Sequence, residues 1–224
     1  MKSIIQYRHV IWDWNGTLLD DAWLCMEITN SLLQPRGLEL LTPERYQRLF
    51  DFPVRIYYER MGFDLEAESF ETLGTAFIEG YNRRRFECHL QPDAATAIEA
   101  LRQAGIGQSI LSASKQESLA EIADHFGLSH AFEEVIGLDD HYAAGKVDLG
   151  KALMERLHHE PAEVLLVGDT VHDHEVAVAM GSDCLLIPSG HHTPAKLARC
   201  GVPMMDSLAD FVRMIHGRIK QTGR

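Results

Sequence analysis

The segment "VIWDWNGTLLDD", residues 10–21, passes from a short apolar run to an acid and then to a tight turn. The apolar run stops at Asp13, and Asn15 stands shortly after it. Gly16 follows, and glycine allows the backbone to turn closely around a bound group. The segment therefore predicts a buried strand with a carboxylate at its carboxyl end.

The chain has 224 residues and a formal net charge of -12 at pH 7. This length suits one large domain, or a core domain with a smaller insertion. The charge argues against binding to nucleic acid or to a membrane surface, since both need basic residues. A metal ion can still bring phosphorylated small molecules to an acidic protein. No apolar run is long enough to span a bilayer, so we expect a cytoplasmic protein, either a monomer or a homodimer.

Several apolar segments indicate buried strands, and helical patterns lie between them. These segments are residues 9–13, 108–113, 132–137, 163–169 and 183–188. Ser114 is expected to cap the helix that follows the second strand. Apolar strands that alternate with helices are typical of a parallel sheet covered on both faces. The sequence thus predicts an α/β fold with a Rossmann-like parallel sheet.

The alternation is interrupted after the first strand. Residues 19–87 contain helical patterns and no predicted strand. Thr42 and Pro43 mark the start of one helix, because threonine caps helices and proline favours their first position. We therefore predict an all-α cap domain, residues 19–87, inserted into a core domain of residues 1–18 and 88–224.

Polar residues stand at the ends of the predicted core strands. Asp13 ends the first strand, Ser112 lies near the end of the second, and Asp169 ends the fourth. Asp173 follows Asp169 closely, and Lys146 precedes the fourth strand. In an open parallel sheet, ligands bind beyond the carboxyl ends of the strands. We expect these side chains to share one edge of the sheet.

This combination suits phosphoryl transfer. Clustered carboxylates repel one another unless a hard cation lies among them, and Mg2+ prefers oxygen ligands. Asp13 and Asp169 are the first candidate ligands, and the carbonyl of Asn15 is a third. A carboxylate beside the ion can attack phosphorus and form an aspartyl phosphate.

The phosphoryl oxygens need hydrogen-bond donors. Ser112, the ammonium of Lys146 and the backbone N–H groups around Gly16 can provide them. Their neighbours Thr17 and Ala113 are added as substrate-binding candidates. Taken singly, a strand-end aspartate, a lysine or a serine has an ordinary structural explanation. Their joint order along the chain favours a shared site.

The segment "DWNGTLLD" resembles the first motif of the haloacid dehalogenase-like hydrolases, most of which are Mg2+-dependent phosphatases. Ser112 in "ILSAS", Lys146 and the segment "VGDTVHD" match the family's other motifs, and the phosphoglycolate-phosphatase-like subgroup is the most similar. The resemblance implies that Asp13 is the nucleophile and that Asp169 and Asp173 lie at Mg2+. It also implies a phosphoric monoester hydrolase whose cap closes over a small phosphorylated metabolite.

Asn15 departs from the family pattern, which usually has an aspartate there to protonate the leaving oxygen and then activate water. An amide does not titrate in the useful range, so it cannot carry this proton. One hypothesis is a phosphatase with another proton carrier, or with a leaving group that needs little protonation. If proton transfer limits turnover, Asn15→Asp should then speed the hydrolysis of alkyl phosphates.

Three alternatives stay open. The first is a sensor or binding protein for phosphate compounds that turns them over poorly. The second is a phosphonate-cleaving enzyme, which would need a cap lysine that residues 19–87 lack. The third is a dehalogenating hydrolase.

Candidates outside these motifs are an arginine and several histidines. Arg55 near a helix start is predicted to contact substrate, whereas the other cap arginines are interpreted as solvated or ion-paired. His172, in the predicted loop after the fourth strand, is a candidate proton carrier, and His174 is expected to begin the next helix. The histidines of "SGHHTP", residues 189–194, are interpreted as loop residues, with Thr193 capping the helix that follows.

Overall fold

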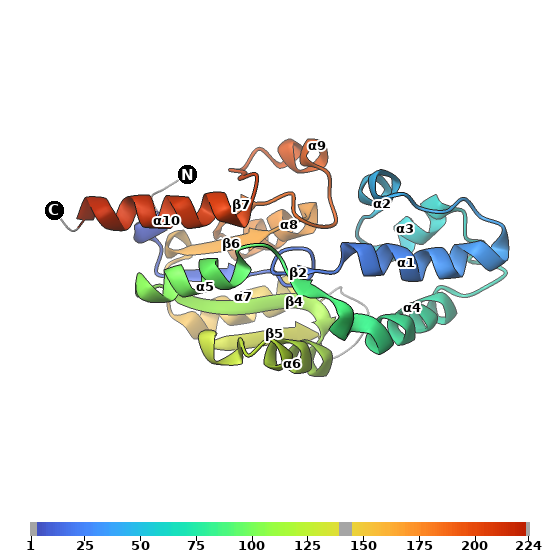
Figure 1. The fold of residues 1–224 in the computed structure, drawn as a ribbon, viewed down its shortest axis with the longest axis horizontal. Coiled ribbons are helices and arrows are strands. Elements are labelled where there is room, and N and C mark those ends of the chain that lie inside the picture. The colour runs from blue at the N-terminus through green and yellow to red at the C-terminus, as the bar shows by residue number, and fades with distance from the viewer. Residues whose placement is uncertain (1–3, 139–144, 223–224) are drawn as a thin grey trace.

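The structure, a computed structural model, describes residues 4–138 and 145–222. Its centre is a parallel sheet of five strands in the order β5-β4-β1-β6-β7 (Figure 1). The strands are β1 (His9–Trp12), β4 (Gly107–Lys115), β5 (Glu134–Leu138), β6 (Val164–Gly168) and β7 (Asp183–Leu186). The predicted α/β fold is confirmed.

Helices cover both faces of this sheet. In the central strand β1, Val10 and Trp12 pack on one face and Ile11 on the other, as the alternation of side chains in a strand requires. The first face is covered by α5 (Ala94–Gln103), α6 (Gln116–His125) and α10 (Leu208–Thr222). The second face is covered by α7 (Lys146–Leu157) and α8 (Val171–Met180), and the short α9 (Pro194–Leu197) follows β7.

Strand β4 is longer than predicted and includes Ser114. The expected capping role of Ser114 is wrong, because Lys115 is the N-cap residue of α6. The hydroxyl of Ser114 donates instead to Oδ1 of Asn15, at 2.6 Å. The added length of β4 thus carries a polar side chain to the edge where Asp13 lies.

A helical cap lies beyond one end of the sheet (Figure 1). It contains α1 (Ala22–Leu33), α2 (Pro43–Leu49), α3 (Val54–Met61) and α4 (Phe70–Arg84). The hydroxyl of Thr42 accepts from the N–H of Arg45, which confirms the predicted start of α2. The cap has its own hydrophobic cluster, formed by Cys25, Leu33, Leu41, Tyr46, Tyr57, Tyr58, Met61, Phe63 and Leu73.

A short antiparallel pair joins the cap to the core. Strand β2 (Leu19–Asp20) pairs with β3 (His89–Leu90) where the chain enters and leaves the cap. The expectation of no strand in residues 19–87 is therefore wrong at its first two positions. A two-residue strand has no periodicity that a sequence pattern can reveal. The domain boundaries after residues 18 and 87 stay a prediction, and they lie beside this pair.

The C-terminal helix α10 was not predicted, yet it closes one face of the sheet. The ring of Phe211 is fully buried and meets the ring of Trp12 edge-on, with centroids 5.4 Å apart. This contact ties the last helix to the central strand. No helix within the described ranges is long and apolar enough to cross a membrane.

We predict that Phe211→Ala lowers the free energy of unfolding by about 3–5 kcal/mol, because it removes a buried aromatic ring and leaves a cavity against Trp12. Chemical denaturation measures this value. The matched control is Val178→Ala in α8, a residue that is 65% exposed, where the substitution should change stability by less than about 0.5 kcal/mol. Equal effects of the two substitutions would contradict the packing role of α10.

Candidate active site

Three buried carboxylates meet at the carboxyl ends of β1 and β6. Asp13 directly follows β1, Asp169 directly follows β6, and Asp173 lies in the first turn of α8. Each offers an oxygen within 4.8 Å of the other two. Asp173 is placed by a capping box, because Thr170 and Asp173 each accept the other's backbone N–H. The expected meeting of these acids at one edge is observed.

Lys146 lies between two of these acids. It is the first residue of α7, is 2% exposed, and places Nζ 2.5 Å from Oδ1 of Asp13 and 2.7 Å from Oδ1 of Asp173. Burial alone lowers the pKa of Lys146, but the two carboxylates outweigh it, so the pKa is raised and the amine is charged. Burial likewise raises the pKa of Asp173, and contact with Lys146 brings it below its usual value.

The other two acids are not fully compensated. Burial and the charge of Asp173 raise the pKa of Asp13 to about 6 despite Lys146. Burial raises the pKa of Asp169 to about 8, opposed by His191 and aided by the charges of Asp13 and Asp173. One ammonium therefore faces more buried negative charge than it neutralises. The ligand atoms that the three acids offer are carboxylate oxygens, which Mg2+ prefers, so the residues fit this ion.

The turn after β1 packs tightly against this cluster. Oγ1 of Thr17 lies 3.0 Å from Oδ2 of Asp13 and 3.2 Å from Oδ1 of Asp169, and its single proton can be donated to only one of them at a time. Gly16 has a φ of 77°, and a Cβ there would collide with the carboxylate of Asp169 and the ring of His191. Glycine is thus required at this position for both its conformation and its size.

Asn15 is held by hydrogen bonds on both sides of its amide. Its Nδ2 donates to Oδ2 of Asp21 at 2.6 Å and to the hydroxyl of Tyr81 at 2.9 Å. Its Oδ1 accepts from the hydroxyls of Ser114 at 2.6 Å and Ser112 at 3.3 Å. The structure therefore brings the predicted residues Asn15 and Ser112 together, and the partly buried Ala113 lies between the two serines in β4.

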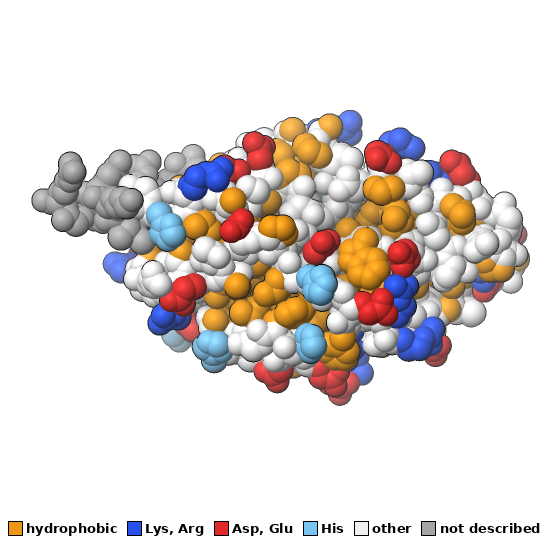
Figure 2. Space-filling model, in the orientation of Figure 1, with side chains coloured by type: hydrophobic (Ala, Val, Ile, Leu, Met, Phe, Trp, Pro, Cys, Tyr) orange, Lys and Arg blue, Asp and Glu red, His pale blue; other side chains and the backbone are white. Residues whose placement is uncertain are grey.

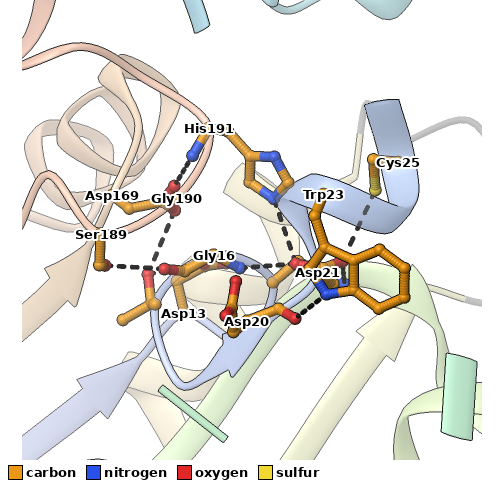
Figure 3. Close-up of polar contacts among 12 residues, drawn as sticks. Asp13, Gly16, Asp20, Asp21, Trp23, Cys25, Asp169, Ser189, Gly190 and His191 are labelled. Atoms are coloured by element: carbon orange, nitrogen blue, oxygen red, sulfur yellow. Dashed lines mark hydrogen bonds and ion pairs between the residues drawn. The ribbon is translucent and has the colours of Figure 1, made fainter. Parts of the chain in front are cut away.

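Sequence reasoning missed a buried ion pair beside this turn. Asp21 is fully buried, and its Oδ1 lies 3.5 Å from Nε2 of His191 (Figure 3). The backbone N–H of His191 donates to Oδ2 of Asp169, and its Nδ1 lies 2.7 Å from the hydroxyl of Tyr46 in α2. Burial lowers the pKa of His191, but Asp21 and Asp169 outweigh it and raise the value to about 9. The available signal was the place of "SGHHTP" after a core strand, at the edge that carries the acids.

Thr193 caps α9 as expected, since its hydroxyl accepts from the N–H of Lys196. The interpretation of the neighbouring histidines as ordinary loop residues is incomplete, because His191 and His192 are both buried. Nδ1 of His192 accepts from the N–H of Val171 at the start of α8. The two histidines thus connect this loop to the acid cluster and to the helix that carries Asp173.

Two of the predicted site residues, Arg55 and His172, make contacts other than those expected. Arg55 is exposed on α3 and forms an ion pair with Glu59 at 3.3 Å, so the structure does not bring it to the acid cluster. The expected loop position of His172 is wrong, because α8 already begins at Val171 and includes both His172 and His174. The ring of His172 packs on Phe52 of the cap, 4.7 Å between centroids.

Basic and acidic side chains stand side by side over the cap (Figure 2). Arg84 pairs with Glu27 and Glu87, and Arg36 pairs with Glu68. These contacts agree with the interpretation of most cap arginines as ion-paired surface residues. Exposed pairs of this kind contribute little to stability.

Comparison with known proteins identifies relatives over most of the chain. A family model described as haloacid dehalogenase-like hydrolase matches residues 10–187. The chain is 26% identical over 184 residues to the tyrosine-protein kinase PtkA of Mycobacterium tuberculosis, which covers 81% of this chain but only 62% of that protein. It is 24% identical over 213 residues to the phosphoglycolate phosphatase of Aliivibrio fischeri, covering 91% of this chain and 90% of that protein.

A solved structure shows the same fold. It is described as a predicted phosphoglycolate phosphatase from Haemophilus somnus and matches with a TM-score of 0.77 at 18% identity. The match covers 93% of this chain and 98% of that one.

We predict that Mg2+ raises the thermal unfolding midpoint, because binding to the folded state alone stabilises it by about 2.7 kcal/mol at 100 times the dissociation constant. Asp169→Asn should abolish this Mg2+-dependent shift. It should also raise the midpoint in EDTA, because the raised pKa of Asp169 means that this carboxyl must take up a proton or carry an unfavourable charge on folding, and asparagine has no such cost. The matched control is Asp93→Asn, the same change at an exposed residue, which should keep the full shift. A normal Mg2+ titration of the Asp169 variant would remove that residue from the metal site.

Proposed function

The chain belongs to the haloacid dehalogenase-like hydrolase family, and we propose that it is a Mg2+-dependent phosphatase acting on a small phosphorylated metabolite. The contact of Asp13 with Lys146 inside the buried acid cluster carries this proposal. It holds a carboxylate at the end of a strand, away from bulk water and beside a permanent positive charge. The similarity to the Aliivibrio fischeri phosphoglycolate phosphatase extends over most of both chains and supports a small phosphorylated metabolite as the substrate.

In the proposed reaction, a carboxylate oxygen of Asp13 attacks phosphorus while the bond from phosphorus to the leaving oxygen breaks. The leaving oxygen takes the electron pair and is protonated by solvent water, which regains a proton from the water molecule that attacks in the next step. Water then attacks the aspartyl phosphate, releases inorganic phosphate and restores the carboxylate. Lys146 and Thr17 orient Asp13 for both steps, because each contacts one of its two oxygens.

Asp169, Asp173 and the carbonyl of Asn15 are the residues that would hold Mg2+ with Asp13. The ion would neutralise charge on the phosphoryl oxygens and reduce repulsion between the phosphoryl group and the buried acids. Ser112 and the N–H groups of the turn at Gly16 would donate to those oxygens. Thr17, which contacts Asp13, and Ala113, which lies next to Ser112 in β4, complete the proposed phosphate-binding set.

Asn15 restricts which substrates this site turns over well. Its amide cannot supply a proton to the leaving oxygen. Substrates whose leaving groups are stable anions, such as aryl phosphates, should therefore react faster than alkyl phosphates. A phosphate-compound sensor is the second candidate function. Both N–H donors of Asn15 are already used within the protein, on Asp21 and Tyr81, so none is free to assist a leaving group. This observation favours binding without turnover.

We predict that Asp13→Asn lowers phosphate release from an aryl phosphate by at least ~1,000-fold, because the nucleophile is lost. The folded state should persist, with an unfolding midpoint no lower than that of the unaltered protein, since the change removes a buried charge. Phosphate release measured with Mg2+ and with EDTA tests both points, and Asp93→Asn again serves as the control. Retained, Mg2+-dependent turnover in the Asp13 variant would refute the nucleophile.

The same assay separates the two candidate functions. If the chain is an enzyme, the unaltered protein releases phosphate from the aryl phosphate only when Mg2+ is present. A sensor shows a raised unfolding midpoint with the phosphate compound and Mg2+, and no product.

A further inference from the structure

Asp21 occupies a helix start without capping the helix. It is the N-cap residue of α1, a position that aspartate favours because its carboxylate can accept the first free N–H groups. Within the described part of the chain, its side chain makes no such bond to α1. The carboxylate is turned toward the site, where Oδ1 accepts the N–H of Gly16 at 2.9 Å (Figure 3). Its Oδ2 accepts from Asn15 at 2.6 Å.

We propose that Asp21 is a positioning residue of the site, and that its buried carboxylate makes asparagine the residue that fits position 15. The kinetic part of this inference rests on the proposed phosphatase function, whereas the pairing of the two side chains does not.

The hydrogen bonds around position 15 match an amide next to a carboxylate. Both donors of the Asn15 amide meet acceptors, on Asp21 and on the hydroxyl of Tyr81. Its oxygen meets donors, the hydroxyls of Ser112 and Ser114. A carboxylate at position 15 would keep the serine contacts but would bring an oxygen to within about hydrogen-bond distance of Oδ2 of Asp21, with no proton between them. Two buried like charges in that arrangement repel strongly.

Asp21 also connects the site to the cap. The hydroxyl of Tyr81, on α4 of the cap, donates to the same Oδ2 at 2.8 Å. One carboxylate thus holds the amide of Asn15, the turn at Gly16 and a cap side chain. Without the Asp21 carboxylate, the Asn15 amide could rotate by about 180°, so that its NH2 group instead of its oxygen faces Ser112.

Exchange of the two residues should preserve the hydrogen bonds of Asn15, Tyr81, the two serines and Gly16, whereas the charged contact of Asp21 with His191 becomes a neutral one. With Asn15→Asp and Asp21→Asn together, the new carboxylate accepts from the new amide, from Tyr81 and from the two serines. The new amide oxygen still accepts the N–H of Gly16. The exchange keeps the net charge of the site and moves the acid to the position that faces Ser112.

The test uses Asn15→Asp, Asp21→Asn and the double variant, each in the full chain. The first measurement is the thermal unfolding midpoint without metal, which does not depend on activity. Asn15→Asp should lower it by at least ~5 °C through repulsion between the two carboxylates, and Asp21→Asn should lower it through loss of the buried pair with His191. The double variant should be at least as stable as Asp21→Asn alone, so that its loss is clearly smaller than the sum of the two single losses. The matched control is the neighbouring Asp20→Asn, which should shift the midpoint by less than about 2 °C.

The second measurement is kcat/KM with Mg2+ on an aryl and an alkyl phosphate. Each single variant should lose at least ~10-fold on the aryl phosphate, and the double variant should recover it and exceed the unaltered protein on the alkyl phosphate. A merely structural role for Asp21 would lower the midpoint and leave kcat/KM of the folded variant unchanged.

Additive losses in the double variant, or an Asn15→Asp protein as stable as the unaltered one, would overturn the pairing. If Asn15→Asp does not fold, the stability of the double variant against that of Asp21→Asn still decides the question. If the unaltered protein releases no phosphate, the proposed function fails, while the midpoints alone still support or refute the pair.

Discussion

The ammonium of Lys146 touches two of three buried carboxylates, and the negative charge that remains shapes the rest of the site. Burying like charges together is unfavourable, so each acid has its own support from the chain. Asp173 is held by the capping box at the start of α8, and Asp169 by the backbone N–H of His191. The parallel sheet makes this possible, because adjacent strands end at the same edge and bring acids far apart in the sequence into contact.

A neutral residue at position 15 agrees with this charge balance. The site already contains a fourth buried acid, Asp21, and a second cation, because His191 lies between Asp21 and Asp169 and its pKa is raised to about 9. A further carboxylate at position 15 would lack a partner of opposite charge. The amide of Asn15 instead uses the excess of acceptors on one side and the serine hydroxyls on the other. The departure from the usual family pattern therefore has a local electrostatic reason.

Residues at strand ends could be predicted from the sequence, and residues that reach the site across the fold could not. Asp13 and Asp169 follow apolar runs, so the strand pattern itself located them. Asp21 has the appearance of an ordinary helix cap, and its contact with Tyr81 spans 60 positions, which no local periodicity encodes. Strand β2 and helix α10 were missed as well, the first because it is too short to show a pattern. Arg55 and His172 were chosen for their places near element ends, and the faces of their helices direct them to Glu59 and Phe52.

The contact between Asn15 and Asp21 also limits how this sequence can change over time. When aspartate and asparagine alone are exchanged one position at a time, the carboxylate moves between the two positions through an intermediate with two acids or with two amides. The route through two acids is opposed by repulsion at a buried position, whereas two amides can still pair after one of them turns over. On the second route, positions 15 and 21 both carry neutral amides before one of them becomes an acid. Lineages that hold the acid at either position should therefore differ at both positions together, and homologues with a single exchange should be rare and should carry amides at both.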